Sequence, residues 1–367
     1  MRVGLLIYGS LETISGGYLY DRKLVEHLLK RGDEVELVSL PWRNYARHLG
    51  DNLSREWRSR LEKLKIDVLL QDELNHPSLA WANRQIRDQV SYPIVSIVHH
   101  LRSSEEHPGW IRPLYRQIER AYLQSVDACI FNSQTTRQAV EQVVGHPAPG
   151  IVATPAGDRF TGQVSAVDVS RRAVREGPLA ALFVGNLIPR KNVGLVIRAL
   201  ARLRKTNWEL NVVGSLTADP SYSQQMQRLA DRSGIRKRVH FLGPLDDADL
   251  AHQFLENHLL AVPSSYEGFG IVYLEGFQHG LPALGSSRGA ARELIAPGET
   301  GWLVDPGQVE EAARCLEAAA LDRAMLARMG VAALERSRFY PTWEQTGERI
   351  RNFLYSGVQW GKFSSWR

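Results

Sequence analysis

Short apolar runs rich in valine, isoleucine and leucine alternate with longer amphipathic stretches through most of this chain. In the first half, the runs that resemble strands lie at residues 2–8, 34–40, 67–70, 94–98 and 128–131. Segments 18–30, 78–90 and 110–124 carry the spacing of amphipathic helices. Strands that alternate with helices predict a parallel sheet with helices on both faces. The fold class that we expect is therefore α/β.

A stretch rich in glycine and proline interrupts this alternation between residues 145 and 178. The strand pattern then resumes at residues 179–184, 208–213, 239–242, 259–262 and 283–285, and helical patterns follow from residue 306. A chain of 367 residues is long enough for two domains with separate cores. We predict an N-terminal domain at 1–165, a C-terminal domain at 166–340, and a last helix and tail at 341–367. Doubly wound sheets bind ligands at the carboxyl ends of their strands, so two facing sheets would form a binding cleft.

The composition is that of an ordinary soluble protein, with 44% hydrophobic and 23% charged residues. No apolar run reaches the roughly 20 residues of a membrane-spanning helix, and the start lacks a signal-peptide pattern. The cysteines, Cys129 and Cys315, predict neither a disulfide framework nor a metal cluster, so we expect a reducing, cytoplasmic setting. A net charge of +5 suits anionic substrates or an anionic membrane, and we recognise no nucleic-acid-binding module.

The first candidate for ligand binding is the segment 185–191, GNLIPRK, which follows a strand and opens a helix. Arg190 and Lys191 therefore project from the carboxyl end of a strand, where a diphosphate would lie. A guanidinium binds two oxygens at once, and an ammonium adds a point charge. The alternative is a solvated basic pair, although the positive end of a helix dipole disfavours cations at this position.

The second candidate is the segment 263–275, PSSYEGFGIVYLE, which also follows a strand. Gly268 and Gly270 let the backbone approach a ligand, and the helix that follows offers free N–H groups to an anion. Glu275 shares the face of the first helical turn, where it can reach a ribose diol, and Glu267 lies ahead of the helix. Carboxylates beside an anion site are unfavourable unless they bind hydroxyls or cations. The alternative is that both acids lie on the surface.

These segments resemble the family-four retaining glycosyltransferases of GT-B fold, also described as glycosyltransferase group 1. Glu267 and Glu275, with seven residues between them, match the glutamate motif of that family, and residues 186–191 resemble its Arg-Lys donor loop. Residues 239–243 resemble its base-binding strand, and residues 15–17, SGG, resemble its N-terminal glycine loop. The likeness covers the C-terminal domain nearly end to end and the N-terminal domain in scattered motifs. It implies two Rossmann-like domains that face each other across a cleft, with the last helix crossing back to the N-terminal domain.

The resemblance implies a role for each matching residue. The loop with Gly185, Asn186, Arg190 and Lys191 would bind and neutralise the donor diphosphate. The amides near Phe269, Gly270 and Ile271 would bind the distal phosphate of the donor. Glu275 would bind the ribose, and the backbone at Leu242 would contact the base. Glu267 would bind the sugar hydroxyls. Gly16 and Gly17 would close over the diphosphate from the N-terminal domain, which would hold the acceptor.

A histidine pair, His99 and His100, ends the buried-strand pattern at 94–98. Enzymes of the family that this chain resembles often have a histidine here, near the donor sugar, and His99 is the better match to the strand end. An imidazole in that place could donate a hydrogen bond to a sugar hydroxyl or support charge at the anomeric carbon. The alternative is a pair of structural histidines at the end of a strand.

The resemblance implies retaining transfer of a hexose from a UDP- or GDP-sugar to a glycan, lipid or small-molecule acceptor. The departing phosphate would help to deprotonate the acceptor. No divalent metal or other cofactor is expected, because basic side chains and helix dipoles would carry the diphosphate. Asp247 and Asp249 resemble the metal-binding acidic triplet of another fold, but at the start of a helix we expect them to serve in capping. The alternatives are a sugar-nucleotide epimerase of similar fold and a non-catalytic regulatory subunit that binds nucleotide sugars.

Two segments, 41–65 and 353–367, combine basic and aromatic side chains. Each fits either a peripheral contact with an anionic membrane or an ordinary solvated helix with its rings in the core. The segment 107–110, HPGW, is a candidate contact to the unknown acceptor.

Overall fold

The computed structural model describes residues 1–160, 162 and 164–359, and the chain divides into two compact units. The first unit consists of Met1–Pro155 and Trp343–Arg367, and the second of Ala156–Thr342. The boundary falls earlier than the predicted residue 165, because Gly157 packs in the second unit. A Cβ atom on Gly157 would lie 2.8 Å from the carbonyl carbon of Leu274. The predicted aromatic tail from residue 360 onward lies outside the described residues.

The sheet of the first unit is parallel throughout, with the strand order β2-β1-β3-β4-β5-β6. Its strands are β1 (Arg2–Tyr8), β2 (Glu34–Leu40), β3 (Val68–Asp72), β4 (Ile94–Val98), β5 (Ala128–Phe131) and β6 (Gly150–Val152). Because the order reverses between β1 and β3, the chain leaves these neighbouring strands in opposite directions. A crevice for ligands opens at such a switch point in doubly wound sheets.

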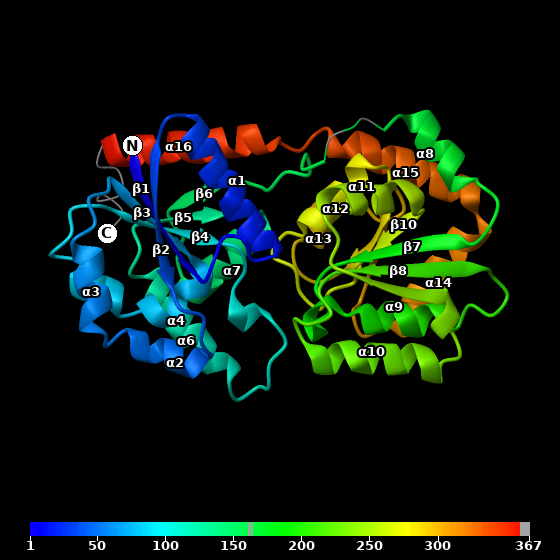
Figure 1. Ribbon diagram of the computed structural model, residues 1–367, viewed down its shortest axis with the longest axis horizontal. Helices are drawn as coiled ribbons and strands as arrows, with labels where there is room; N and C mark the ends of the chain where they lie inside the picture. Colours follow the sequence, from blue (N-terminus) through cyan, green and yellow to red (C-terminus); the bar gives the residue numbers. More distant parts are fainter. Residues whose placement is uncertain (161, 163, 360–367) are drawn as a thin grey trace. The chain divides into compact units, whose positions relative to one another are not determined.

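The helices of this unit cover both faces of the sheet (Figure 1). They are α1 (Gly16–Lys30), α2 (Tyr45–Asp51), α3 (Arg55–Glu62), α4 (His76–Leu79), α5 (Ala82–Ile86), α6 (Arg112–Leu123) and α7 (Gln134–Val144), with short 3-10 turns η1 (Glu73–Asn75) and η2 (Arg102–Ser104). The prediction of a single helix over residues 78–90 is wrong, because the chain forms α4 and α5 there. Asn52 breaks it, because its Oδ1 accepts hydrogen bonds from the backbone N–H groups of Trp81 and Ala82, at 2.9 and 3.1 Å.

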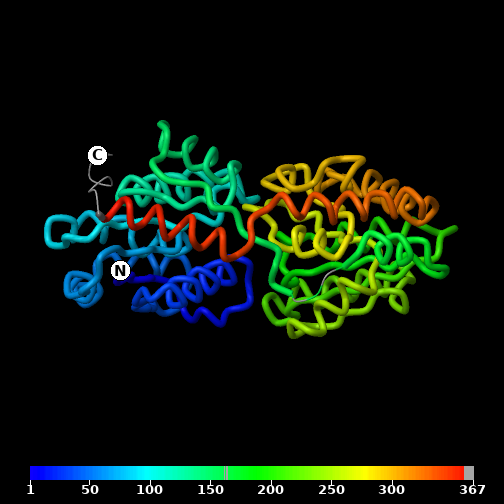
Figure 2. The backbone as a smooth tube through the Cα atoms, turned by 90° about the horizontal axis from the view of Figure 1, so that it is seen from above, coloured from blue at the N-terminus to red at the C-terminus, as the bar shows by residue number. Residues whose placement is uncertain are grey.

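The last helix, α16 (Trp343–Gln359), packs alongside α1 in the first unit, as both views make visible (Figures 1 and 2). Arg351 on α16 donates to Asp33 at 2.6 Å, and the Thr346 hydroxyl donates to the carbonyl of Thr154 at 2.8 Å. The prediction that the last helix returns to the N-terminal domain is confirmed.

The sheet of the second unit is also parallel, with the order β12-β11-β10-β7-β8-β9. Its strands are β7 (Leu179–Val184), β8 (Trp208–Val213), β9 (Val239–Gly243), β10 (Leu259–Ala261), β11 (Ala283–Ser286) and β12 (Gly301–Val304). The order reverses between β7 and β10. The loops that follow these two strands therefore share the switch point of the second sheet.

Helices cover both faces of this sheet too, with α9 and α10 on one side and α11 and α12 on the other (Figure 1). They are α8 (Ala166–Ala173), α9 (Val193–Leu200), α10 (Pro220–Arg232), α11 (Asp247–Glu256), α12 (Ile271–Gln278), α13 (Ala291–Leu294), α14 (Val309–Leu321) and α15 (Arg323–Ser337), with 3-10 turns η3 (Pro189–Lys191) and η4 (Arg236–Arg238). Among the described residues of the chain, no helix is both long and apolar enough to cross a lipid bilayer.

Candidate active site

The switch point of the second sheet brings together the charged residues that the sequence singled out. Arg190 and Lys191 lie in η3 after β7, and Glu267 lies in the loop between β10 and α12. The Nζ atom of Lys191 is 2.5 Å from Oε1 of Glu267, and an Nη atom of Arg190 is 3.5 Å from Oε2. The Ser264 hydroxyl donates to the same carboxylate at 2.6 Å. We call these residues the donor-site cluster: Arg190, Lys191, Ser264 and Glu267.

The carboxylate of Glu267 is ionised although it is only 6% exposed. Burial alone would raise its pKa, but Lys191 and then Arg190 lower the pKa to about 2. Burial in turn lowers the pKa of Lys191, and Glu267 opposes that shift. The two cations thus hold a buried anion between them, and they stand at the carboxyl end of β7, where a second anion can approach.

Gly289 shapes the loop that carries Glu267. The φ angle of Gly289 is +76°, and a Cβ atom there would lie 2.4 Å from the carbonyl oxygen of Glu267. The same oxygen accepts a hydrogen bond from the N–H of Ala290 at 2.9 Å. The backbone of Glu267 is therefore fixed by a neighbour that has room for no side chain.

Substituting Gly289→Ala is expected to destabilise the second unit much more than Gly298→Ala does. Gly298 also has a left-handed backbone, with φ +80°, but among the described residues no atom beyond its own chain neighbours lies within 4 Å of the position that a Cβ atom would occupy there. Gly298→Ala should cost about 1–2 kcal/mol for the backbone alone. Gly289→Ala should cost about 1–3 kcal/mol more because Glu267 must move. Urea denaturation checks the difference, and equal midpoints for the two variants would refute a tight fit at Gly289.

The start of α12 lies next to the donor-site cluster and is built to leave its amides free. Gly270 caps the helix in a left-handed conformation, with φ +91°, and no side chain among the described residues caps it. Phe269 and Ile271 on either side are 3% and 9% exposed. The N–H of Tyr273 donates to the carbonyl of Gly270 at 3.0 Å, so the N–H groups of residues 269–271, with the positive end of the helix dipole, are the ones available to an anion.

Glu275, one turn into α12, is only 4% exposed, and its partner is a residue that we did not predict. An Nη atom of Arg159 lies 3.5 Å from Oε1 of Glu275, and its Nε donates to Asp247 at 3.2 Å. Burial raises the pKa of Glu275, and Arg159 lowers it only in part, so that the pKa is about 7. Arg159 lies in the glycine- and proline-rich connection, where nothing in the sequence pattern distinguishes it.

The other predicted donor residues lie after β7 or near the end of β9. A Cβ atom on Gly185 would lie 3.4 Å from the Lys191 side chain, so that glycine lies against the lysine stem. The Oδ1 of Asn186 accepts from the N–H of Ser215 at 3.2 Å, which ties the loops after β7 and β8 together. Leu242, 40% exposed, lies near the carboxyl end of β9, at the edge of the sheet beyond β8.

The first unit brings its predicted residues together as well. His99 follows β4, and Gly16 and Gly17 are the first residues of α1, which Ser15 caps by accepting from the N–H of Tyr18 at 3.3 Å. A Cβ atom on Gly17 would lie 3.1 Å from the His99 ring. The Nε2 of His99 is 3.3 Å from Oδ1 of Asp21, another residue that we did not predict.

His100 and the segment 107–110 lie on a neighbouring part of the first unit. His100 pairs with Glu105, Nε2 to Oε1 at 2.8 Å, and His107 contacts the carbonyl oxygen of Arg102 at 2.8 Å. Trp110 is 79% exposed. The proposed acceptor contact of this segment remains a prediction.

Two groups of side chains in the first unit have the residue types of metal ligands. Asp21, Asp72 and His99 form one, and Glu73, His76 and Glu119 the other, each with ligand atoms within 4.8 Å of one another. The expectation that Asp247 and Asp249 cap α11 is wrong. The cap is the preceding residue, Asp246, whose carboxylate accepts from the N–H of Asp249 at 2.9 Å, while Asp247 pairs with Arg159.

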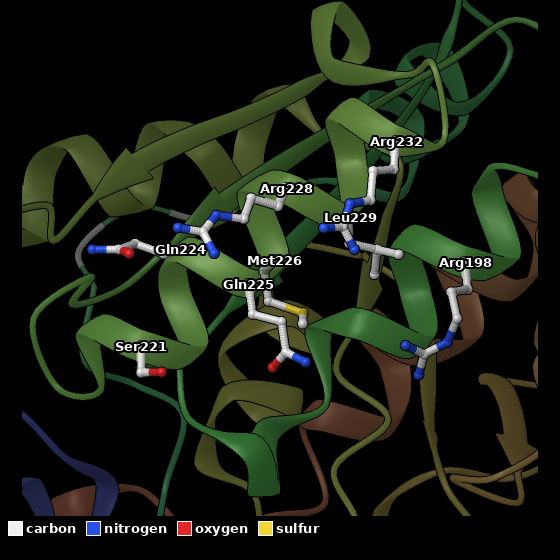
Figure 3. Close-up of a pocket in the computed structure, with 8 residues that line it drawn as sticks. All are labelled: Arg198, Ser221, Gln224, Gln225, Met226, Arg228, Leu229 and Arg232. Carbon is white, nitrogen blue, oxygen red and sulfur yellow. The ribbon is translucent and has the colours of Figure 1, made fainter.

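A surface concavity of about 440 Å³ lies elsewhere on the second unit (Figure 3). Its walls are side chains of α9 and α10: Arg198, Ser221, Gln224, Gln225, Met226, Arg228, Leu229 and Arg232. None of the residues predicted to bind the donor lines it. We therefore place the candidate site at the switch point and not in this concavity.

Comparison with known proteins gives a family for each unit. Residues 168–336 match the family model described as "Glycosyl transferases group 1", and residues 20–157 match "Glycosyltransferase Family 4". A D-inositol 3-phosphate glycosyltransferase of Streptomyces avermitilis is 34% identical over 197 residues, which cover 52% of this chain and 42% of that relative. The protein of the same name from Kribbella flavida is 28% identical over 343 residues, which cover 86% of this chain and 81% of that relative.

Solved structures share the fold along nearly the whole chain. Sucrose-phosphate synthase from Thermosynechococcus elongatus superimposes with a TM-score of 0.83 at 20% identity, covering 98% of this chain and 99% of that one. Anabaena Alr3699/HepE in complex with UDP-glucose does so with a TM-score of 0.77 at 19% identity, covering 97% and 100%. With a glycosyltransferase model matched on each unit and glycosyltransferases among its relatives, the chain belongs to the group 1 glycosyltransferases of GT-B fold.

Proposed function

We propose that this glycosyltransferase moves a hexose from a nucleoside-diphosphate sugar to an acceptor with retention of anomeric configuration. The observation that carries the proposal is the donor-site cluster beside the uncapped start of α12. Arg190 and Lys191 would neutralise the diphosphate, and the amides of residues 269–271 would bind its distal phosphate. Glu275 would accept the ribose hydroxyls, the backbone at Leu242 would contact the base, and Glu267 would hold the sugar.

The same cations explain how the leaving group would depart without a divalent metal. Negative charge develops on the distal phosphate as the anomeric C–O bond breaks, and Arg190, Lys191 and the helix dipole would stabilise it. The departing phosphate oxygen would then take the proton of the acceptor hydroxyl. His99, with Gly16 and Gly17, would contact the donor from the first unit.

We favour a UDP-sugar as the donor, with a GDP-sugar as the alternative. A protein of this fold has been solved in complex with UDP-glucose, which supports a donor of that class. The relatives named D-inositol 3-phosphate glycosyltransferases are consistent with a small polar acceptor, and glycans and lipids remain alternatives.

We further propose that the enzyme is cytoplasmic and that the surface at α2 and α3 contacts an anionic membrane. Trp42 and Leu53 next to these helices are 63% and 78% exposed, and both helices carry arginines. Flotation with vesicles of phosphatidylcholine and phosphatidylserine tests the contact. Binding at low salt that high salt reverses is expected, and absence of binding at low salt would reject the membrane contact.

The deciding experiment is isothermal calorimetry of the intact protein with UDP, GDP and ADP in the presence of EDTA, followed by product analysis with the corresponding sugars. We expect binding of one diphosphate without metal and transfer of its sugar to an added acceptor. An epimerised nucleotide sugar would favour the epimerase, and binding without turnover would favour the regulatory subunit. No affinity for any of the diphosphates would reject the donor site.

Removing Arg159 should make donor binding more dependent on pH. Both oxygens of Glu275 can accept hydroxyl hydrogens only when the carboxyl group is ionised, and its pKa is about 7, so UDP affinity of the native protein should rise from pH 6 to pH 8. Arg159→Met removes the cation that lowers this pKa. The variant should bind UDP about threefold to tenfold more weakly at pH 7 and recover at higher pH.

Arg328→Met is the matched control for this variant, because Arg328 is an exposed arginine of the same unit, on α15. Calorimetry at pH 6, 7, 8 and 9 gives the profile of each protein. Superimposable profiles for the native protein and Arg159→Met would show that Arg159 does not act on Glu275.

A further inference from the structure

A buried acidic pair lies at the switch point of the first sheet, outside the donor-site cluster. Asp21 is on α1, which follows β1, and Asp72 ends β3, the neighbouring strand. They are 0% and 2% exposed. His99 follows β4, the next strand along, and ligand atoms of all three residues lie within 4.8 Å of one another.

The ring of His99 is held in one orientation by several contacts. Its Nε2 is 3.3 Å from Oδ1 of Asp21, and the ring of Tyr20 meets it edge-on at 5.3 Å. Gly17 lets α1 approach the ring closely, and the His99 carbonyl accepts from Asn132 at 2.7 Å. With the ring fixed in this way, Nδ1 remains without a hydrogen-bond partner among the described residues, and the side chain is 13% exposed.

We propose that Asp21, supported by Asp72, is a positioning residue that holds His99 as an imidazolium, so that Nδ1–H is presented as a hydrogen-bond donor to a hydroxyl or phosphate oxygen of the nucleotide sugar. The choice of ligand rests on the proposed function. A neutral ring whose Nε2–H faces Asp21 could only accept at Nδ1, whereas the imidazolium donates there. The two acids therefore decide what kind of group His99 recognises.

Charge balance in this buried group supports the imidazolium. Oδ2 of Asp21 is buried and has no hydrogen-bond partner among the described residues, and an uncompensated carboxylate there would be costly. Burial would lower the pKa of His99, but Asp21 foremost, then Asp72 and Glu73, raise it to about 9. Burial and the charge of Asp21 raise the pKa of Asp72 to about 7, so the pair carries fewer than two negative charges near neutral pH.

The two tyrosines and the histidine next to His99 have other hydrogen-bond partners. Tyr18 on α1 donates its hydroxyl to the carbonyl of Tyr8, and Tyr20 donates to the carbonyl of Ala153. Burial raises the pKa of both phenols, so they remain neutral. His100, next in the chain, pairs with Glu105.

The test is an NMR titration of the full chain labelled with 15N-histidine, for the native protein, Asp21→Asn and Asp88→Asn. The native His99 should titrate near pH 9, and Asp21→Asn should lower that pKa by about 1–3 units. Asp88 is exposed and precedes β4, at the end opposite to His99, so Asp88→Asn should leave the value unchanged. A native His99 that titrates near 6.5, or a value unaffected by Asp21→Asn, would overturn the proposal.

Two further arms keep the result interpretable. If Asp21→Asn does not fold, Asp72→Asn replaces it, with a fall in the His99 pKa again expected and no fall counting against the proposal. Each titration is repeated in EDTA and with Mg²⁺ or Mn²⁺, because saturable metal-induced changes at His99 would make the group a metal site and overturn the proposal. The readout needs no donor, so a high His99 pKa without any affinity for UDP or GDP would reject the donor site alone.

Discussion

Replacing Lys191 by methionine is expected to weaken UDP binding by about tenfold to a hundredfold and to abolish sugar transfer. A hydrogen bond to a charged partner contributes about 1.5–3 kcal/mol, and each 1.4 kcal/mol changes a binding constant tenfold. The variant also leaves Glu267 with Arg190 as its only remaining cation within the cluster, 3.5 Å away. The less compensated carboxylate then repels the diphosphate, which adds to the loss.

Calorimetry with UDP in EDTA measures the affinity of Lys191→Met, and circular dichroism verifies the fold. Lys205→Met is a suitable control, because Lys205 is an exposed lysine of the second unit and the substitution removes the same charge. The control should bind UDP like the native protein. Undiminished UDP affinity in Lys191→Met would show that the lysine serves only to balance Glu267.

The central strands and the phosphate-binding loops could be predicted because their signals are local. The runs at 179–184 and 259–262 are short and apolar and are followed by a glycine and a proline, respectively, and the structure has β7 and β10 there. The edge strands β6 and β12 were missed because they are short: residues 150–152 are all half-buried, and two of residues 301–304 are. A half-buried edge strand of this length has neither a buried run nor a regular alternation to reveal it.

The partners of the predicted site residues could not be read from the sequence. Arg159 contacts Glu275 because the connecting segment folds against α12, and Asp21 contacts His99 because β1 and β4 flank β3 in the sheet. Nothing near Arg159 in sequence marks it as part of a site, and the glycine loop at residues 15–17 lies near Asp21 without indicating its contact with His99. Gly289 is similar, because its need for glycine arises from the backbone of Glu267 on another loop. Local pattern identifies loops that can hold a ligand, whereas these pairings depend on tertiary packing.

Replacing Glu267 by glutamine should separate donor binding from transfer. Glutamine keeps the shape of the side chain and an oxygen that can accept from Ser264, but it removes the charge that holds Lys191 and Arg190. The two cations then face each other without an anion, and a bound diphosphate restores the balance. UDP affinity should therefore be unchanged or higher, the opposite of the result expected for Lys191→Met.

Transfer by Glu267→Gln should fall by about a hundredfold or more. Positive charge develops at the anomeric carbon in the transition state, and a carboxylate that holds the sugar hydroxyls stabilises that charge better than an amide does. Calorimetry with UDP and a rate assay with UDP-glucose give the two quantities separately, and Glu299→Gln, an exposed acid of the same unit, serves as the control. A parallel loss of UDP binding and transfer would mean that Glu267 only organises the two cations. Retained binding without transfer would identify Glu267 as the group that acts on the sugar.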